Sequence, residues 1–182
     1  MISKTEATIE DLYKVEGKAE IVNGEIVHMS PTGFWPGRAA KRIVRSLDDH
    51  EGQHGGGVAV PDNVAFTVDL PHRKSFSPDA AWYTGDAESA GMRFLDGAPA
   101  FAVEVRSQED YSPRAERRIQ EKIDDYFAAG TIVVWDVDLL SPEVIRVYRN
   151  TDRANPTIYR RGESAEAEPA VPGWRFPVDR LF

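Results

Sequence analysis

The stretch "PAFAVEVRS", from Pro99 to Ser107, has the composition of a buried strand and yet carries two charges. Successive side chains of a strand point to opposite faces, so Glu104 and Arg106 lie together on one face, and the other face is apolar. A buried charge without a partner destabilises a fold, so the two charges must have a partner or a use. The pair therefore forms either a structural ion pair or part of a functional site.

A short loop leads from this strand into the best-marked helix of the sequence, "SPRAERRIQEKIDDYFAAG". Ser112 is placed to cap it, Pro113 is its first residue, and Gly130 follows its end. The apolar positions that we expect to face a sheet are Ile119, Ile123, Tyr126 and Phe127. Lys122 lies on the margin of that face, so we expect it to reach Glu104 at the end of the strand.

The remaining segments predict a sheet around this unit. Asn23-Gly24 stands between two alternating apolar runs, which indicates a tight hairpin with Glu20 and Glu25 on one face. Helical spacing predicts a helix over about residues 36–51, and "TIVVWDVD" and "EVIRVYR" form a second hairpin. The segment "DAESAGMRFLDGAP" is predicted to be a loop.

The order of these elements predicts an α/β (α+β) fold, a mixed β-sheet flanked by helices, with N-terminal and C-terminal β-hairpins. With 182 residues, 41% of them hydrophobic, we expect a single domain over residues 1–182. Its core spans about residues 19–150. Residues 151–182 form an extension that wraps the sheet, anchored by Trp174 and Phe176.

Composition excludes several classes of site. The chain has no cysteine, which excludes disulfides, thiolate metal sites and cysteine nucleophiles. It has no signal peptide and no apolar run of membrane-spanning length, so we expect a cytoplasmic protein without a membrane partner. The net charge of −8 argues against an extended nucleic-acid-coating face. One local basic run is either a solvated helix face or a contact for a nucleic-acid backbone: Arg38, Lys41, Arg42 and Arg45.

A second carboxylate, Asp79 in "SPDAAW", opens a strand after Pro78. Together with Glu104 it would form an oxygen-rich site suited to Mg²⁺ or Mn²⁺. A lysine beside such a metal can orient or deprotonate water. Arg106 cannot be that base, because its guanidinium stays protonated, but it can steady Glu104 or a developing phosphate charge.

The sequence resembles a known family at this point. Asp79 followed by Glu104-Val105-Arg106 is similar to the PD-(D/E)XK nuclease pattern. Six ordered motifs resemble the Uma-two family of restriction endonucleases: "EIVNGEIVHMSPTG", "SPDAAW", "FAVEVRS", "EKIDDYFAAG", "WDVD" and "VYR". The resemblance implies a restriction-endonuclease-like fold, a Mg²⁺ or Mn²⁺ site, and an endonuclease that hydrolyses phosphodiester bonds of nucleic acid, with DNA as the expected substrate.

The resemblance also assigns roles to residues. Glu20, Asp79 and Glu104 match the acids that hold the metal, and the carbonyl of Val105 is expected to add a ligand. Lys122 matches a lysine moved from the strand to the helix.

Arg106 stands where the wider superfamily has lysine, and this departure leaves open which cation assists the water. We favour Lys122, because it alone could act as a base. The structural alternatives are a Glu104–Arg106 ion pair, a surface lysine at 122 and an ordinary hairpin residue at Glu20.

Three further interpretations compete with this one. Asp62 also precedes a strand, but it lacks the Ser-Pro-Asp-Ala context of Asp79. His50 and His54 formally match a zinc-protease motif, but Gly52 between them predicts a helix end, so we interpret both as surface histidines. The rival function is a non-catalytic binding or assembly module on the same fold, for example a homodimer, which the net charge favours.

Overall fold

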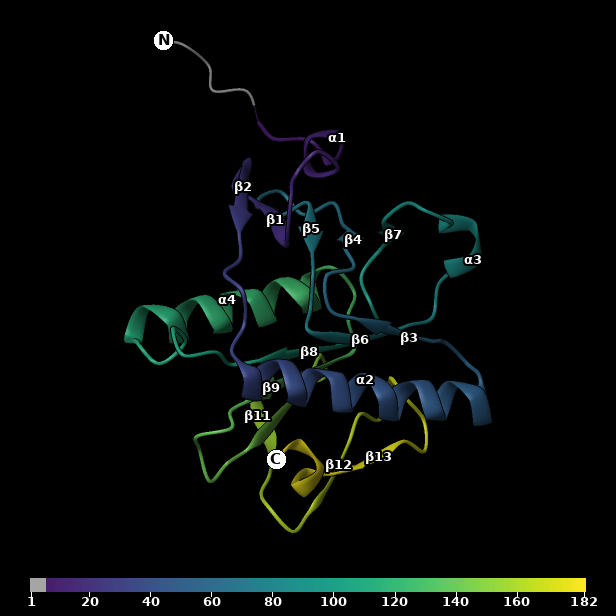
Figure 1. Ribbon diagram of the computed structural model, residues 1–182, viewed down its shortest axis with the longest axis vertical. Coiled ribbons are helices and arrows are strands. Elements are labelled where there is room, and N and C mark those ends of the chain that lie inside the picture. The colour runs from purple at the N-terminus through teal and green to yellow at the C-terminus, as the bar shows by residue number, and fades with distance from the viewer. Residues whose placement is uncertain (1–5) are drawn as a thin grey trace.

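The structure is a computed structural model that describes residues 6–182. Its helices and strands have the following bounds (Figure 1): α1 Ile9–Leu12, β1 Ala19–Val22, β2 Glu25–His28, α2 Phe34–His54, β3 Val58–Pro61, β4 Phe66–Thr67, β5 Ser75–Phe76, β6 Ala80–Tyr83, α3 Ala87–Ala90, β7 Leu95–Asp96, β8 Phe101–Val105, α4 Pro113–Ala128, β9 Val133–Val137, β10 Ile145–Arg149, β11 Asp152–Tyr159, β12 Ser164–Glu166, β13 Arg175–Pro177 and the 3-10 helix η1 Val178–Leu181.

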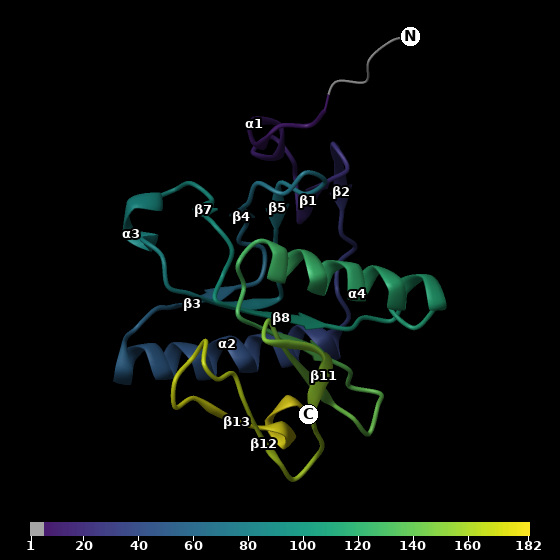
Figure 2. The ribbon, with the colours of Figure 1, turned by 180° about the vertical axis from the view of Figure 1, so that it is seen from behind.

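The central sheet has the strand order β11-β10-β9-β8-β6-β3. Within this sheet of the described chain, β8 and β9 are the one parallel pair, and α4 connects them, as a parallel pair requires a crossover connection. The two long helices lie on opposite sides of the sheet, α4 on one and α2 on the other, as the views from front and back both show (Figures 1 and 2). This arrangement confirms the predicted mixed sheet flanked by helices.

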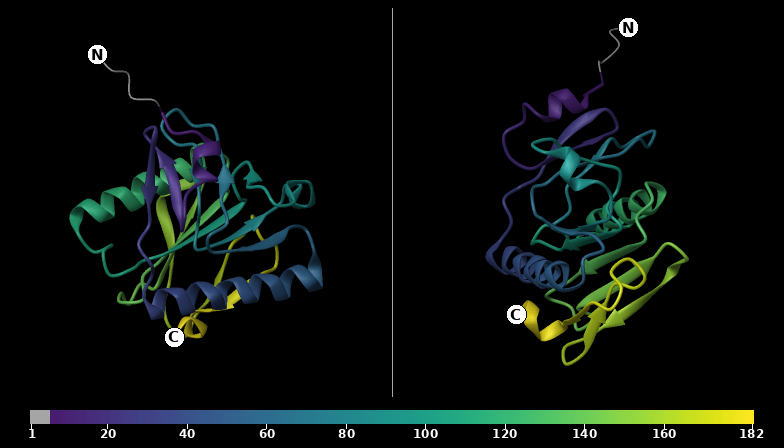
Figure 3. Two further views of the ribbon diagram at one scale, coloured as in Figure 1. Left: turned by 45° about the horizontal axis from the view of Figure 1, so that its top comes forward. Right: turned by 90° about the vertical axis from the view of Figure 1, so that its right-hand side faces the viewer.

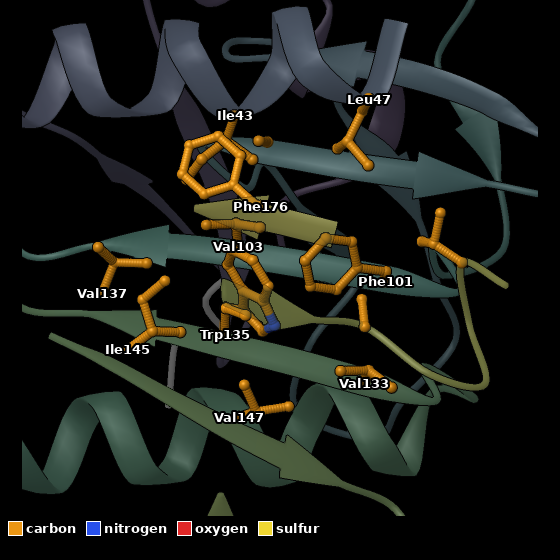
Figure 4. Close-up of a cluster of buried hydrophobic side chains, with 14 of the residues drawn as sticks. Ile43, Leu47, Phe101, Val103, Val133, Trp135, Val137, Ile145, Val147 and Phe176 are labelled. Atoms are coloured by element: carbon orange, nitrogen blue, oxygen red, sulfur yellow. The ribbon is translucent and has the colours of Figure 1, made fainter. Parts of the chain in front are cut away.

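Side-chain alternation along β8 divides its residues between two cores. Phe101 and Val103 pack in the larger cluster with Ile43 and Leu47 of α2, as Figure 4 shows. Ala102 packs in the second cluster, which contains Ile123, Tyr126 and Phe127 of α4. Glu104 follows Ala102 by two residues, so its side chain points to the α4 side of the sheet.

The predicted N-terminal hairpin is confirmed. Asn23 and Gly24 both have positive φ, 52° and 72°, as a type I′ turn requires. Glu20 pairs with Val27 across the hairpin, and Val22 forms a bridge with Arg73 in the loop before β5. The hairpin and α1 lie at the end of the molecule opposite the C-terminal segment (Figure 3). The pairing with Arg73 places the hairpin face that carries Glu20 beside the central sheet.

Several predicted boundaries differ from the structure. Helix α2 covers residues 34–54 rather than about 36–51. It continues through Gly52, because a glycine inside a helix costs only about 1 kcal/mol. The predicted loop at residues 86–99 contains α3 and β7. The C-terminal extension contributes β11 to the sheet edge, and its anchors Trp174 and Phe176 are buried in the larger core, as expected.

Candidate active site

Lys122 lies between two carboxylates that come from different elements. Its Nζ is 2.9 Å from Glu20 Oε1 of β1 and 2.9 Å from Glu104 Oε1 of β8. The lysine side chain is 16% exposed, so the ammonium is mostly withdrawn from water. The predicted reach from α4 to the end of β8 is therefore confirmed.

Asp79 is fixed beside Glu104 by the backbone of β8. Its backbone N–H donates to Val103 O at 3.0 Å, and its Oδ2 accepts from the Val105 N–H at 2.7 Å. Its other carboxylate oxygen, Oδ1, accepts from Lys18 Nζ at 2.8 Å. The structure thus brings Asp79, Glu104 and Lys122 together, although 43 residues separate the first from the last along the chain (122 − 79).

Glu20 uses both carboxylate oxygens within the protein. Oε1 accepts from the Ser77 N–H at 2.8 Å as well as from Lys122, and Oε2 accepts from Arg73 Nη1 at 2.6 Å. Arg73 in turn donates through Nε to Asp125 Oδ2 at 2.7 Å. Glu20, predicted as a metal ligand, therefore acts in this structure as a support for Lys122.

Within residues 6–182, no group of three or more His, Asp or Glu side chains is arranged to hold a metal ion. The predicted set of three carboxylates is not among such groups: Glu20 and Glu104 both bond to Lys122, Glu20 also bonds to Arg73, and Asp79 bonds to Lys18. What the structure does bring together is the pair Asp79 and Glu104, with the backbone of Val105 between them.

The charges in this cluster shift one another's pKa values. Burial raises the pKa of Glu104, and the neighbouring charges of Asp79 and Glu20 raise it further against the opposing effect of Lys122. Burial alone would raise the pKa of Glu20, but Lys122 and Arg73 outweigh it, and its pKa lies below the ordinary value. Burial would lower the pKa of Lys122, but Glu104 and Glu20 raise it. Lys122 is therefore an ammonium at neutral pH.

Arg106 does not pair with Glu104, so the alternative of a Glu104–Arg106 ion pair and the expected steadying of Glu104 by Arg106 are both wrong. It donates to both oxygens of Asp136, from Nε at 2.8 Å and from Nη2 at 2.7 Å, and it also pairs with Glu116. Asp136 stands opposite Glu104 in the parallel register of β8 and β9. The arginine thus neutralises a buried acid of the next strand, and its guanidinium is not directed at the Asp79–Glu104 pair.

Tyr126, which the apolar pattern predicts as core, has two roles. Its ring stacks on Phe76 with centroids 4.1 Å apart. Its Oη donates to Glu104 Oε1 at 2.6 Å. Glu104 therefore has one oxygen held by both Lys122 and Tyr126.

The histidine motif forms the last turn of α2, which ends at His54, so the predicted helix end is confirmed. His54 is exposed as predicted, but the predicted surface position of His50 is wrong. His50 is buried, stacked on His54 with ring centroids 4.4 Å apart, and its ring meets the edge of Trp82. Glu51 accepts from the Ala59 N–H at 2.7 Å. These contacts tie α2 to β3 and β6, and they give the motif a packing role.

Two residues around the site, Lys18 and Arg73, were missed from the sequence, and Asp62 was considered there only as a rival of Asp79. Lys18 stands two residues before Glu20, so strand alternation places both on one face. Arg73 and Asp62 lie in irregular segments. Arg73 is 53 residues from Glu20, a pairing that no local pattern indicates.

A cavity of about 220 Å³ opens beside Asp79. Its walls come from α2 and the segments around it: Thr32, Pro36, Gly37, Ala40, Lys41, Val44, Pro61, Asp62 and Asp79. Lys41 and Arg45 of the predicted basic run are exposed. Arg42 instead bonds to the carbonyls of Arg180 and Phe182, and the Arg38 guanidinium lies over the Phe34 ring.

The Glu20→Gln variant is expected to lose stability in a pH-dependent way. The pKa of Glu20 lies below its ordinary value of 4.5, so its ion pairs stabilise the fold above that pH and are lost as the pH falls through the lower, folded pKa. In urea unfolding at pH 7, we expect the free energy of unfolding of the variant to be about 3 kcal/mol below that of wild type. This difference should become smaller toward acid pH. A Glu10→Gln control changes an exposed residue. A difference in unfolding free energy that stays constant from neutral to acid pH would contradict the assignment of Glu20 as an ion-paired carboxylate.

Comparisons with known proteins agree with this architecture. A family model for Uma2, described as "Putative restriction endonuclease", matches residues 7–179. A crystal structure of a putative nuclease belonging to DUF820 from Anabaena variabilis superposes with a TM-score of 0.74 and 14% sequence identity, covering 97% of each chain. No curated protein matches the chain. The likeness confirms the predicted restriction-endonuclease-like fold. In the described part of the chain, no helix is long and apolar enough to cross a membrane.

Proposed function

The chain belongs to the Uma2 family of putative restriction endonucleases, and on that premise we propose that it is a metal-dependent nuclease that hydrolyses nucleic-acid phosphodiester bonds. The observation that carries the proposal is the convergence of Asp79, directly before β6, with Glu104 of β8 and Lys122 of α4. A lysine between two acids, with a third carboxylate that borders a cavity, is an arrangement suited to this chemistry.

The donor set fits a hard divalent cation. Asp79 and Glu104 offer carboxylate oxygens, and we propose the Val105 carbonyl as a further ligand. Mg²⁺ is usually bound through one or two carboxylates and retains several waters, so the third acid of the predicted set is not required. Burial, and after it the negative charges of Asp79 and Glu20, raise the pKa of Glu104, and a positive ion beside Glu104 would oppose both effects. Such an ion would supply Lewis-acid stabilisation of charge on the phosphate.

The chain's own residues would position the reacting groups. Glu20 and Glu104 hold the Lys122 ammonium, and Tyr126 holds Glu104. Because its pKa is raised, we assign Lys122 the role of a hydrogen-bond donor that orients water and stabilises negative charge, instead of the predicted base. Its position between two carboxylates restricts the directions in which its remaining proton can point.

We propose that the nucleic acid approaches over the N-terminal half of α2. Lys41 lines the cavity that Asp79 borders, and Arg45 follows it by one helical turn. Such residues contact phosphates, which places the backbone without reading sequence. Arg42 is not included, because it is bonded to the C-terminal carbonyls.

The proposal is tested by incubating the protein with supercoiled plasmid DNA, single-stranded DNA and RNA in the presence of Mg²⁺ or Mn²⁺. We expect nicking or cleavage of at least one substrate, abolished by chelation. An Asp79→Asn variant purified in the same way measures contaminating nuclease. Equal cleavage by wild type and variant, or no cleavage of any substrate, would overturn the proposal.

The second candidate is a non-catalytic binding or assembly module, with a homodimer as one form. It is favoured by one observation: in residues 6–182 the site acids are paired with lysines and arginine, and no three-ligand group is formed. In that case the acids are a structural network. Titration with millimolar Mn²⁺ would then give no heat of binding, whereas the nuclease proposal expects binding that is lost in Asp79→Asn.

A further inference from the structure

Lys18 stands directly before β1 and makes contacts that the proposed chemistry does not use. Its Nζ lies 2.8 Å from Asp79 Oδ1 and 2.6 Å from Asp62 Oδ1. Its side chain is 17% exposed, so the ammonium is held between these two carboxylates and largely withdrawn from solvent. A positive charge thus already occupies the oxygen of Asp79 that Val105 leaves free.

The hairpin fixes the backbone at Lys18, whereas the two aspartate side chains hold its ammonium. The Lys18 carbonyl accepts from the Met29 N–H at 3.0 Å, which extends the pairing of β1 and β2 to residue 18. The four-carbon stem beyond it is flexible, and its ammonium can exchange partners at low cost. Movement of Lys18 would therefore require no change in the backbone.

Asp62 provides a second acceptor for that ammonium. Its side chain is 46% exposed, more than twice the 20% of Asp79. Its Oδ1 also accepts from the Asn63 N–H at 2.8 Å, which holds the carboxylate in place. Both aspartates border the same cavity, through which an ion from solvent can reach them.

We propose that Lys18 is a built-in counter-cation that competes with the divalent ion for Asp79, and that Asp62 takes over its ammonium when the ion binds. This rests on the proposed metal site at Asp79 and Glu104. A nearby unit positive charge opposes binding of another cation. The divalent ion binds only the molecules in which Lys18 has left Asp79, so the apparent affinity for the ion falls as Lys18 occupies Asp79 in a larger fraction of molecules. Lys18 would then set the metal concentration at which the site fills.

The test is isothermal titration of Mn²⁺ into the full-length protein. Lys18→Met keeps the length of the side chain and removes its charge, so we expect it to bind Mn²⁺ about 10-fold more tightly than wild type. Lys14→Met is the matched control, because Lys14 is exposed in the turn after α1 and its one ion pair among the described residues is with Asp11. Unchanged or weaker binding by Lys18→Met would overturn the proposal.

A double-mutant cycle tests the role of Asp62. Asp62→Asn leaves Lys18 with Asp79 as its remaining carboxylate partner, so we expect binding to weaken by about 5-fold in the wild-type background. In the Lys18→Met background we expect Asp62→Asn to weaken Mn²⁺ binding by less than about 2-fold. Equal weakening of Mn²⁺ binding in both backgrounds would mean that Asp62 acts directly on the metal. That result would overturn the proposed transfer of the Lys18 ammonium from Asp79 to Asp62.

The outcomes separate this inference from the proposed function. Tighter Mn²⁺ binding by Lys18→Met supports the inference even when no substrate is cleaved, in which case the nuclease proposal alone fails. Wild-type cleavage combined with identical affinities of wild type and Lys18→Met overturns the inference alone. No binding by any variant overturns the inference and the metal site together.

Discussion

The Lys122→Met variant is expected to lower the rate of phosphodiester cleavage by about 10³-fold. Methionine keeps a side chain of similar length but removes the ammonium that lies 2.9 Å from both Glu20 and Glu104. The site would lose its donor for water and for developing negative charge. Glu104 would keep the hydrogen bond from Tyr126, so the carboxylate should stay near its place.

The measurement is the initial rate on the substrate that wild type cleaves, at saturating Mg²⁺. Because Lys122 neutralises buried acids, the variant's folding is checked by circular dichroism and urea unfolding before its rate is compared. Lys14→Met, the exposed control, should cleave at the wild-type rate. A folded Lys122→Met protein that cleaves as fast as wild type would remove the lysine from the mechanism.

The Arg106→Met variant is expected to lower the free energy of unfolding by about 3–5 kcal/mol. The change leaves Asp136 without its bidentate partner, and Asp136 is 1% exposed. Arg146 Nη1 lies 3.7 Å from Asp136 Oδ2, too far to replace the two hydrogen bonds from Arg106. The buried carboxylate would therefore have to be protonated or hydrated, and both are costly. The measurement is equilibrium urea unfolding at pH 7.

Two comparisons make this prediction specific. Arg161→Met breaks an exposed ion pair with Asp179 and should change stability little. Adding Asp136→Leu to Arg106→Met removes the stranded acid, so the double variant should be more stable than the single one. A loss below about 1 kcal/mol for Arg106→Met would contradict the assignment of Arg106 as the partner of Asp136.

The local parts of the site were predictable because each is encoded within a few residues. Alternation along β8 places Glu104 on the α4 side, and the spacing of Ile119, Lys122 and Ile123 on one helix directs the lysine to the same place. The hairpin turn at Asn23-Gly24 likewise fixes which residues of β1 face together.

The partners of each charge could not be predicted in the same way. Alternation shows that Glu104 and Arg106 share a face, but it does not show which neighbouring strand lies beside them. The parallel pairing of β8 with β9 brings Asp136 to Arg106, and the Val22–Arg73 bridge brings Arg73 to Glu20. These pairings depend on tertiary contacts between distant segments.

The most direct test is a crystal structure of the protein soaked in Mn²⁺, with the ion located by its anomalous signal. We predict a peak within coordination distance of Asp79 and Glu104, with Lys122 still between Glu20 and Glu104. A peak elsewhere, or no peak with Lys122 turned to solvent, would contradict the assignment of these residues to one metal-dependent site.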